Sequence, residues 1–300
     1  MKKLIALMLV VLSLLGLFAG CQDSTTPSDA PKSYTISGKF KDTKVTTIVE
    51  GKLTVAISPD FAPMEFVDPT KLGQAMYVGF DVILANYIAD ELGLELVLKP
   101  MSFDACQTAV YTGAADMSIS GFSWTEDREA KYNMSTYYYA GENENEQVLI
   151  TTKANEGKFD TAEKLAGAKI GAQNASLQQS LVEAQLPNST LELYTDIGTG
   201  VLQLKNGDFD CMAVADGNAD AIIASNPDLI KSGFVFYVDP KETGNVILLQ
   251  KGADELTNVV NQILAESEKY WTAWYEEACS ISGIDQSYDD DGNVVTEGVG

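Results

Sequence analysis

The chain has 300 residues, 45% of them hydrophobic, and a formal net charge of −23, because 43 Asp and Glu outnumber 20 Lys and Arg. This length accommodates two ordinary domains, and the hydrophobic fraction excludes a disordered chain. The acidic charge argues against binding to nucleic acid and against attraction to an anionic membrane surface. The absence of His removes the commonest metal ligand and the usual general base, so we expect no metal and no cofactor.

The N-terminus carries an export signal. Lys2 and Lys3 precede an apolar run that ends at Ala19, which predicts a signal peptide over residues 1–20 rather than a spanning helix. The stretch from Leu17 to Cys21 resembles the bacterial lipobox, so we expect Cys21 to be lipidated and to become the mature N-terminus. Ordinary signal cleavage nearby is the alternative. No later stretch is expected to span a membrane.

Residues 21–48 are rich in Ser, Thr, Pro, Asp and Lys and show no periodicity, which predicts a flexible tether. The three later cysteines, Cys106, Cys211 and Cys279, allow one disulfide with a thiol left over, or three buried free thiols, which we favour. Their spacing matches no metal motif.

The first half of the body alternates strands and helices, which is typical of a parallel sheet covered by helices. The expected elements are a strand at 53–57, a helix at 81–92, a strand at 94–99, a helix at 103–111 and a strand at 117–119.

The pattern then restarts, so we expect a second α/β lobe of similar make-up. Its expected strands are 147–151, 169–173, 191–195, 209–215 and 235–238, with helices over 160–166, from 176, over 199–205 and from 216 to 225. A strand at 245–250 and a helix from Glu255 follow, and the aromatic cluster at 271–275 is interpreted as packing. Residues 285–300 are expected to form a solvated acidic tail, because Asp289 to Gly292 lacks the later Glu of a calcium loop.

The segment from Ser118 to Arg128 collects hydroxyl groups and one guanidinium where a strand ends and a helix begins. In open α/β sheets small ligands bind at the carboxyl ends of the strands. An Arg there offers a planar fork of donors that suits a carboxylate. The segment is either a carboxylate site or a solvated Ser-rich turn with a surface Arg.

Several motifs in order make the chain resemble the bacterial extracellular solute-binding proteins of family 3, the amino-acid receptors of ABC importers. The resemblance covers most of residues 51–280 and rests on Pro59-Asp-Phe-Ala-Pro63, Val78-Gly-Phe-Asp-Val82, Met101-Ser-Phe-Asp104, Ala115-Asp-Met-Ser118, Thr125-Glu-Asp-Arg128 and Gly207-Asp-Phe-Asp210 followed by Asp216.

The resemblance implies an α/β protein with the two-lobed, type II periplasmic-binding-protein-like fold and two hinge crossover strands. Lobe 1 would comprise residues 49–146 and 241–284, and lobe 2 residues 147–240. The crossovers would lie near Gln147 and Val235.

The resemblance also implies roles for individual residues. Arg128 would bind the α-carboxylate of an amino acid and Asp216 its α-ammonium group. The alternative for Asp216 is a helix cap. The alternative for Phe61 and Phe103, which would contact the ligand side chain, is core packing. Further expected contacts are the loop residues Ser118, Ser120, Gly121 and Ser123, the helix start Ala175-Ser176, and the side-chain contacts Ser58, Phe61 and Phe103. Relatives often carry Asp where this chain has Ser58, which makes a cationic ligand less certain.

The implied function is that of an amino-acid-binding lipoprotein of an ABC transporter. It would capture a polar or neutral amino acid by cleft closure and deliver it to membrane permease subunits. We expect a monomer outside the cytoplasm, lipid-anchored to the cell membrane, that catalyses no reaction. The alternatives are a dehydratase-like enzyme on the same fold, with Asp216 or Glu65 as its acid, and the extracellular module of a sensor.

Overall fold

The computed structural model describes residues 33–139, 146–283, 287–288 and 294–295. These residues belong to one compact unit, Ser33–Gly300. The predicted signal peptide, Cys21, the segment 141–145 and most of the acidic tail lie outside the described residues. Within the part that is described, no helix combines the length and the apolar character needed to cross a membrane.

The first sheet has five strands in the order β5-β1-β6-β13-β7. They are β1 (Lys52–Ile57), β5 (Glu95–Pro100), β6 (Met117–Ser123), β7 (Tyr132–Met134) and β13 (Asn245–Gln250). The strand β1 pairs in parallel with β5 and β6, whereas β13 runs antiparallel to β6 and β7. A short hairpin sheet of β2 (Asp60–Phe61), β3 (Glu65–Val67) and β4 (Tyr77–Val78) follows β1 and contains the 3-10 turn η1 (Gly73–Met76).

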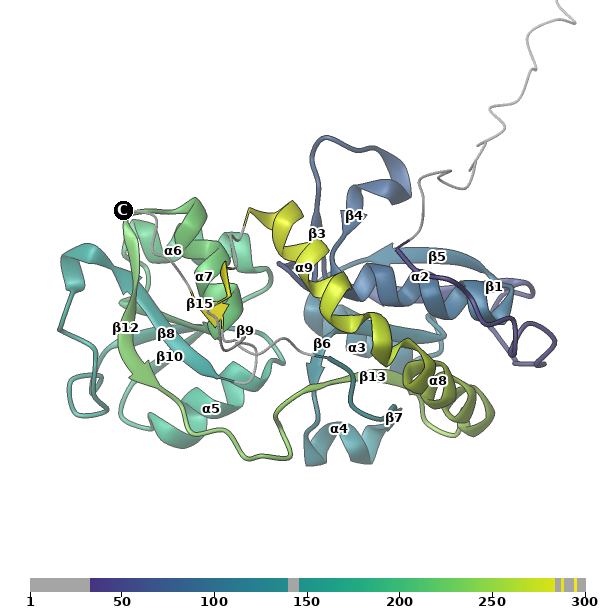
Figure 1. The fold of residues 1–300 in the computed structure, drawn as a ribbon. Helices are drawn as coiled ribbons and strands as arrows, with labels where there is room; N and C mark the ends of the chain where they lie inside the picture. The colour runs from purple at the N-terminus through teal and green to yellow at the C-terminus, as the bar shows by residue number, and fades with distance from the viewer. Residues whose placement is uncertain (1–32, 140–145, 284–286, 289–293, 296–300) are drawn as a thin grey trace, which may run out of the picture. The chain divides into compact units, whose positions relative to one another are not determined.

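Helices cover both faces of the first sheet. One face packs against α2 (Phe80–Leu92), α8 (Asp254–Ser267) and α9 (Trp271–Ser282), with η4 (Glu268–Tyr270) between the last two. Figure 1 shows α8 and α9, at the yellow end of the colour scale, beside α2. The other face packs against α3 (Phe103–Tyr111). We call these elements, with α4 (Glu126–Lys131), lobe 1.

The second sheet has the strand order β10-β9-β11-β8-β12. Its strands are β8 (Gln147–Thr152), β9 (Lys169–Gln173), β10 (Thr190–Tyr194), β11 (Cys211–Ala215) and β12 (Leu229–Val235). The strands β9, β10, β11 and β12 run in the same direction, and β8 runs antiparallel to its neighbours β11 and β12. With α5 (Leu177–Gln185), α6 (Ile197–Asn206), α7 (Asp216–Ser225) and η3 (Lys153–Asn155), this sheet forms lobe 2.

The chain passes between the two sheets twice. It leaves the first sheet after β7 to enter the second at β8, and it returns after β12 to β13. This connectivity makes lobe 1 discontinuous in sequence, as the resemblance implied.

Two local expectations were wrong. No helix forms over residues 160–166, where the structure has only turns. Leu165 is the one buried residue of that stretch, so a helix there would have no apolar face to pack, and isolated short helices are unstable in water. The expected strand 235–238 instead runs over 229–235, where Leu229 is buried against lobe 2.

The predicted flexible tether does not extend through residues 33–48. The Tyr34 ring packs edge-on against Tyr87 and Trp274, with ring centroids 5.1 and 5.7 Å apart. The Tyr34 hydroxyl lies 2.6 Å from an Asp90 carboxylate oxygen, and the Ser37 hydroxyl donates to Glu91 at 2.8 Å. The ring of Tyr34 and the hydrogen bonds of Tyr34 and Ser37 therefore attach this otherwise polar segment to α2.

Packing explains the aromatic cluster near the C-terminus, as expected. Trp274 is fully buried and stacks on Tyr270 with ring centroids 5.4 Å apart. Cys106 and Cys211 are buried free thiols, in agreement with the favoured interpretation, and Cys279 is buried as well.

Candidate ligand-binding site

A cavity that opens to solvent lies between residues of lobe 1 and residues of lobe 2, and about 390 Å³ of empty space belongs to the cavity and its opening together. In lobe 1 its lining comes from β2, α3 and β6. In lobe 2 it comes from the ends of β9, β10 and β11 and from the starts of the helices that follow them, which is where open α/β sheets bind ligands. The lining residues are Phe61, Phe103, Ser120 and Gly121 from lobe 1, and Gln173, Ser176, Gln178, Tyr194, Ile197, Ala213, Val214, Ala215 and Asn218 from lobe 2.

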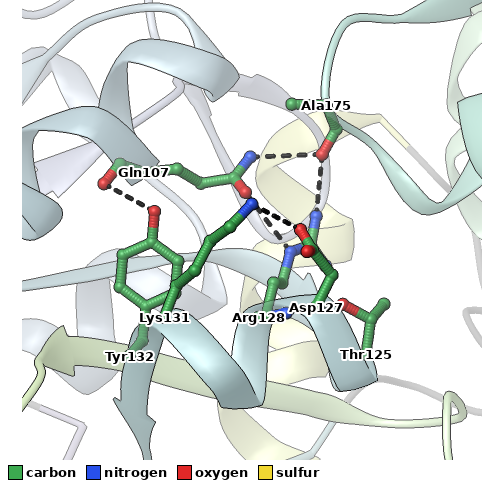
Figure 2. Close-up of polar contacts among 7 residues, drawn as sticks. All are labelled: Gln107, Thr125, Asp127, Arg128, Lys131, Tyr132 and Ala175. Atoms are coloured by element: carbon green, nitrogen blue, oxygen red, sulfur yellow. Dashed lines mark hydrogen bonds and ion pairs between the residues drawn. The ribbon is translucent and has the colours of Figure 1, made fainter.

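Arg128 is buried beside this cavity without a carboxylate partner among the described residues. The helix α4 begins at the cap Thr125, whose hydroxyl accepts from the Arg128 amide at 3.2 Å. The guanidinium donates to the carbonyls of Ser123 at 2.7 Å and Ala175 at 2.9 Å, and more weakly to the Gln107 amide oxygen at 3.4 Å. Figure 2 shows the contacts of Arg128 with Gln107 and Ala175, and the contact with Ala175 joins lobe 1 to lobe 2.

The environment of Arg128 is unfavourable for an unpaired charge. Burial lowers the pKa of its guanidinium to about 10, so the group still carries a proton at neutral pH. Its carbon Cζ lies 5.6 Å from the centre of the Phe103 ring and 5.3 Å from that of Phe122. Every oxygen that accepts from it is neutral, and an anion would be a stronger partner than any of them.

Of the four lobe 1 serines expected at the site, Ser120 lines the cavity and the other three do not. Ser120 lines the cavity, and its oxygen accepts from the Ser58 amide at 2.9 Å. Ser118 is fully buried and donates to the Ala56 carbonyl, which joins β6 to β1. Ser123 offers its carbonyl to Arg128. The Ser58 hydroxyl donates to Asp60 at 2.9 Å, and neither Ser58, Ser118 nor Ser123 is part of the lining.

Gly121 and the two phenylalanines are brought together. Gly121 has φ +57°, and a Cβ on it would lie 2.7 Å from the Phe61 ring, so the close approach requires glycine. Phe103 stacks on Phe122 with ring centroids 4.7 Å apart. Both Phe61 and Phe103 line the cavity and also pack against lobe 1 side chains. Their positions therefore fit a ligand contact as well as core packing.

The start of α5 contacts lobe 1. Ser176 caps the helix by accepting from the Gln179 amide at 3.1 Å, and it lines the cavity. Ala175 has a left-handed backbone with φ +62°. Its carbonyl accepts from both Arg128 and Gln107 of lobe 1, so the unusual backbone conformation accompanies a bridge between the lobes.

The structure does not bring Asp216 into the cavity lining. It is the first residue of α7, and its carboxylate lies 2.7 Å from the Lys231 ammonium group, which also pairs with Asp220 at 2.8 Å. A helix start after a buried strand is equally suited to a ligand contact and to an ion pair. In the structure the cation that Asp216 binds is Lys231.

Four residues that link the lobes at the cavity were missed from the sequence. The Asp60 carboxylate accepts from the Ile197 amide at 2.8 Å and from Gln173 Nε2 at 3.1 Å. Asn218 Nδ2 donates to the Ala62 carbonyl at 3.1 Å. Burial raises the pKa of Asp60, although the hydrogen bonds from the Ile197 amide and the Ser58 hydroxyl oppose the rise. The Pro-rich loop after β1 was visible in the sequence, but the lobe 2 partners of Asp60 were not.

The comparison with protein families decides what kind of protein this is. The family model of the bacterial extracellular solute-binding proteins, family 3, matches residues 53–276. The chain belongs to this family. Its fold is the two-lobed, type II periplasmic-binding-protein-like fold, and its family consists of binding proteins rather than enzymes, so the dehydratase alternative is not supported.

Similar proteins support an amino-acid-binding role. A probable histidine-binding protein of Campylobacter jejuni is 29% identical over 85% of this chain and 93% of its own length. The arginine-binding extracellular protein ArtP of Bacillus subtilis is 29% identical over 72% of this chain and 81% of its own length. The structure of a substrate-binding protein from Streptococcus pneumoniae bound to L-arginine has a TM-score of 0.71 and 32% identity, covering 79% of this chain and 97% of that one. This solute-binding protein therefore acts outside the cytoplasm in amino-acid transport.

Proposed function

We propose that this solute-binding protein captures a free amino acid by closing its two lobes around it and delivers it to the permease subunits of an ABC importer. A ligand that touches both lobes favours the closed form by its differential affinity for that form. The bonds of Arg128, Gln107, Asp60 and Asn218 to the opposite lobe indicate that the closed arrangement is accessible.

The buried guanidinium of Arg128 carries the proposal. It lacks a carboxylate among the described residues and lies where lobe 1 meets the start of α5. An incoming α-carboxylate would replace a neutral carbonyl as its partner, and the free amides at the start of α5 also favour an anion. Phe61, Phe103, Ser120, Gly121 and Ser176 remain proposed contacts because they line the cavity.

The remaining proposed contacts act less directly. Ser58, Ser118, Ser123 and Ala175 would support the cavity through their bonds to neighbouring residues, and Asp216 would reach a ligand only after leaving Lys231. We propose a polar or neutral ligand side chain, because none of the described residues that line the cavity is charged. A thermal-shift screen of the twenty amino acids tests this point, since a tight ligand stabilises the native protein by mass action.

We also propose that the protein is a monomer lipid-anchored through Cys21. Its N-terminal pattern supports the anchor, and two or more acyl chains hold a protein firmly at a membrane because each buried methylene contributes about 0.8 kcal/mol. Mass spectrometry of the mature N-terminus and metabolic labelling with a fatty acid test the anchor, and an unmodified N-terminus would refute it.

The variant Arg128→Ala tests the central claim. A hydrogen bond to a charged group contributes about 1.5–3 kcal/mol, so calorimetry should show amino-acid affinity falling at least about tenfold. Arg128→Lys keeps the charge but not the planar fork, so an intermediate loss is expected. Lys131→Ala is the matched control, since Lys131 lies on the same helix, is exposed, and among the described residues pairs with Asp127 alone. Unchanged affinity in Arg128→Ala would refute the proposed site.

A further inference from the structure

Two fully buried carboxyl groups lie directly behind one wall of the cavity. Glu65 on β3 and Asp81 on α2 are both 0% exposed. Asp81 accepts from the Gly121 amide at 2.8 Å and from the Tyr138 hydroxyl at 2.9 Å, and Glu65 accepts from the Ser120 hydroxyl at 2.5 Å. No Lys or Arg among the described residues pairs with either acid, so nothing there neutralises two negative charges.

The hydrogen bonding of the pair requires one proton. Glu65 Oε2 and Asp81 Oδ1 are buried and receive no donor from the described residues. The two side chains are close enough to bond to each other. Adjacent buried carboxylates cannot both ionise, and one proton between these two oxygens satisfies both. The pair then carries a single negative charge.

Burial makes both acids harder to ionise. Burial and the neighbouring Asp81 raise the pKa of Glu65 well above its usual range. Burial also raises the pKa of Asp81, to about 7, while hydrogen bonds from Gly121 and Tyr138 oppose the rise. Near neutral pH the pair therefore exchanges between forms that hold one proton and two protons.

The pair also determines what the wall can offer a ligand. Ser120 and Gly121 both line the cavity, and each gives its own donor to the acids behind it. The Ser120 hydroxyl hydrogen and the Gly121 amide hydrogen are therefore already donated, which favours a ligand group that donates over one that accepts. Lone pairs backed by a negative charge suit a cationic donor such as an ammonium group. Arg128 bonds to Ser123 further along the same chain segment, so an anion site and a cation site lie next to each other.

We propose that Glu65 and Asp81 hold one proton and one negative charge behind Ser120 and Gly121, and that this charge makes the wall bind the α-ammonium group of the amino acid. The inference rests on the proposed function and adds to it how the buried acids behind the wall strengthen the binding of the ammonium group. Glu65 and Asp81 are positioning residues, because they act on the ligand through Ser120 and Gly121. An ammonium group next to the wall favours ionised Asp81, so binding expels the second proton of the pair.

The surroundings restrict which groups can produce such a pH dependence. Tyr138 faces Asp81 from the segment after β7, and burial raises its pKa well above the ordinary value, so it stays neutral below pH 9. Asp60 on β2 is the other acid close to Glu65, and burial raises its pKa as well. The variant Asp60→Asn therefore serves as a control for the pH profile, whatever it does to the affinity at a single pH.

Calorimetry of the wild-type protein tests the shared charge. L-glutamine and L-arginine serve as a neutral and a cationic probe, each titrated from pH 5.5 to 8.5 in two buffers with different heats of ionisation. We expect proton release near pH 7 and an affinity that rises by about tenfold toward pH 8.5, which corresponds to a fall of one unit in the pKa of Asp81 on binding. Affinity independent of pH, with no proton release, would overturn the proposal.

Two variants separate the charge from the packing. Glu65→Gln keeps a donor toward Asp81 and an acceptor for Ser120, so it mimics the protonated acid and should bind like the wild type at pH 8. The double variant Glu65→Gln/Asp81→Asn has the same shape without the charge, and its affinity should fall about tenfold and lose its pH dependence. A double variant that binds like Glu65→Gln would overturn the proposal, and if it fails to fold, proton release by Glu65→Gln decides.

The proposed function fails separately from this inference. Binding of none of the twenty amino acids, or binding that Arg128→Ala leaves unchanged, would refute the proposed function. Binding that depends on Arg128 but neither on pH nor on the charge of the pair would refute only the role of Glu65 and Asp81.

Discussion

Asp60 offers a direct test of how the two lobes are held together. Its carboxylate accepts from the Ile197 amide and from Gln173 Nε2, both on lobe 2. Ile197 is the first residue of α6, where backbone amides have no partner within the helix and the helix dipole favours an anion. We predict that Asp60→Asn weakens closure, because Asn keeps one acceptor oxygen but loses the charge.

The size of this effect follows from the contacts that are lost. A carboxylate at a helix N-terminus contributes about 0.3–1 kcal/mol, and up to about 2 kcal/mol where it is partly buried. The weaker bond to Gln173 adds to this, so we expect the closed form to lose about 1–2 kcal/mol. That loss changes the ratio of closed to open molecules by a factor of about 5–30. The apparent affinity falls by as much as the same factor, since only the closed form completes the site.

Calorimetry measures the lower affinity, and small-angle scattering measures how far the ligand-free protein opens. The loss of affinity should be equal for every amino acid that binds, and the ligand-free variant should have a larger radius of gyration. Asp208→Asn is the matched control, because this exposed acid follows α6. Unchanged affinity and scattering would refute the reasoning. A loss confined to cationic amino acids would instead make Asp60 a contact for the ligand side chain.

Two further predictions concern backbone positions at the edge of the cavity. Gly121→Ala adds a Cβ 2.7 Å from the Phe61 ring at φ +57°, so its melting temperature should fall. Gly167→Ala is the control, because φ is +81° there but nothing lies within 4 Å of the added Cβ. An equal fall in melting temperature for the two variants would contradict the clash. Ala175→Gly removes the cost of a left-handed Ala, about 1–2 kcal/mol, against about 0.5–1 kcal/mol of added chain entropy, so urea unfolding should show a gain of about 0.5–1 kcal/mol. A destabilised Ala175→Gly variant would show that the left-handed conformation carries no strain.

The local parts of the site were predictable from the sequence. Ser118 to Arg128 does form the end of a strand and the start of a helix, because β-strand alternation and a Thr cap act within a few residues. Ser176 was predicted as a helix cap for the same reason, and the structure confirms it. The order of the solute-binding family's motifs along the chain then indicated the two-lobed fold.

The contacts between distant residues were not predictable. Asp60 meets partners 113 and 137 residues away, and no periodic pattern records such a pairing. Asp216 shows the same limit, because its sequence context is identical whether it binds a ligand or Lys231. The tether prediction failed at Tyr34 because the composition of residues 21–48 outweighed one aromatic side chain that finds a partner in α2.

The position of β13 has a consequence for the order in which the lobes fold. This strand lies between β6 and β7 in the first sheet, yet all of lobe 2 is synthesised before it. During export the sheet of lobe 1 therefore has a gap until residues 245–250 have emerged, whereas the strands of lobe 2 follow one another without interruption. Since long-range pairing is slow and exposes unpaired strand edges, lobe 2 is expected to fold first, and lobe 1 is the part that needs protection from aggregation.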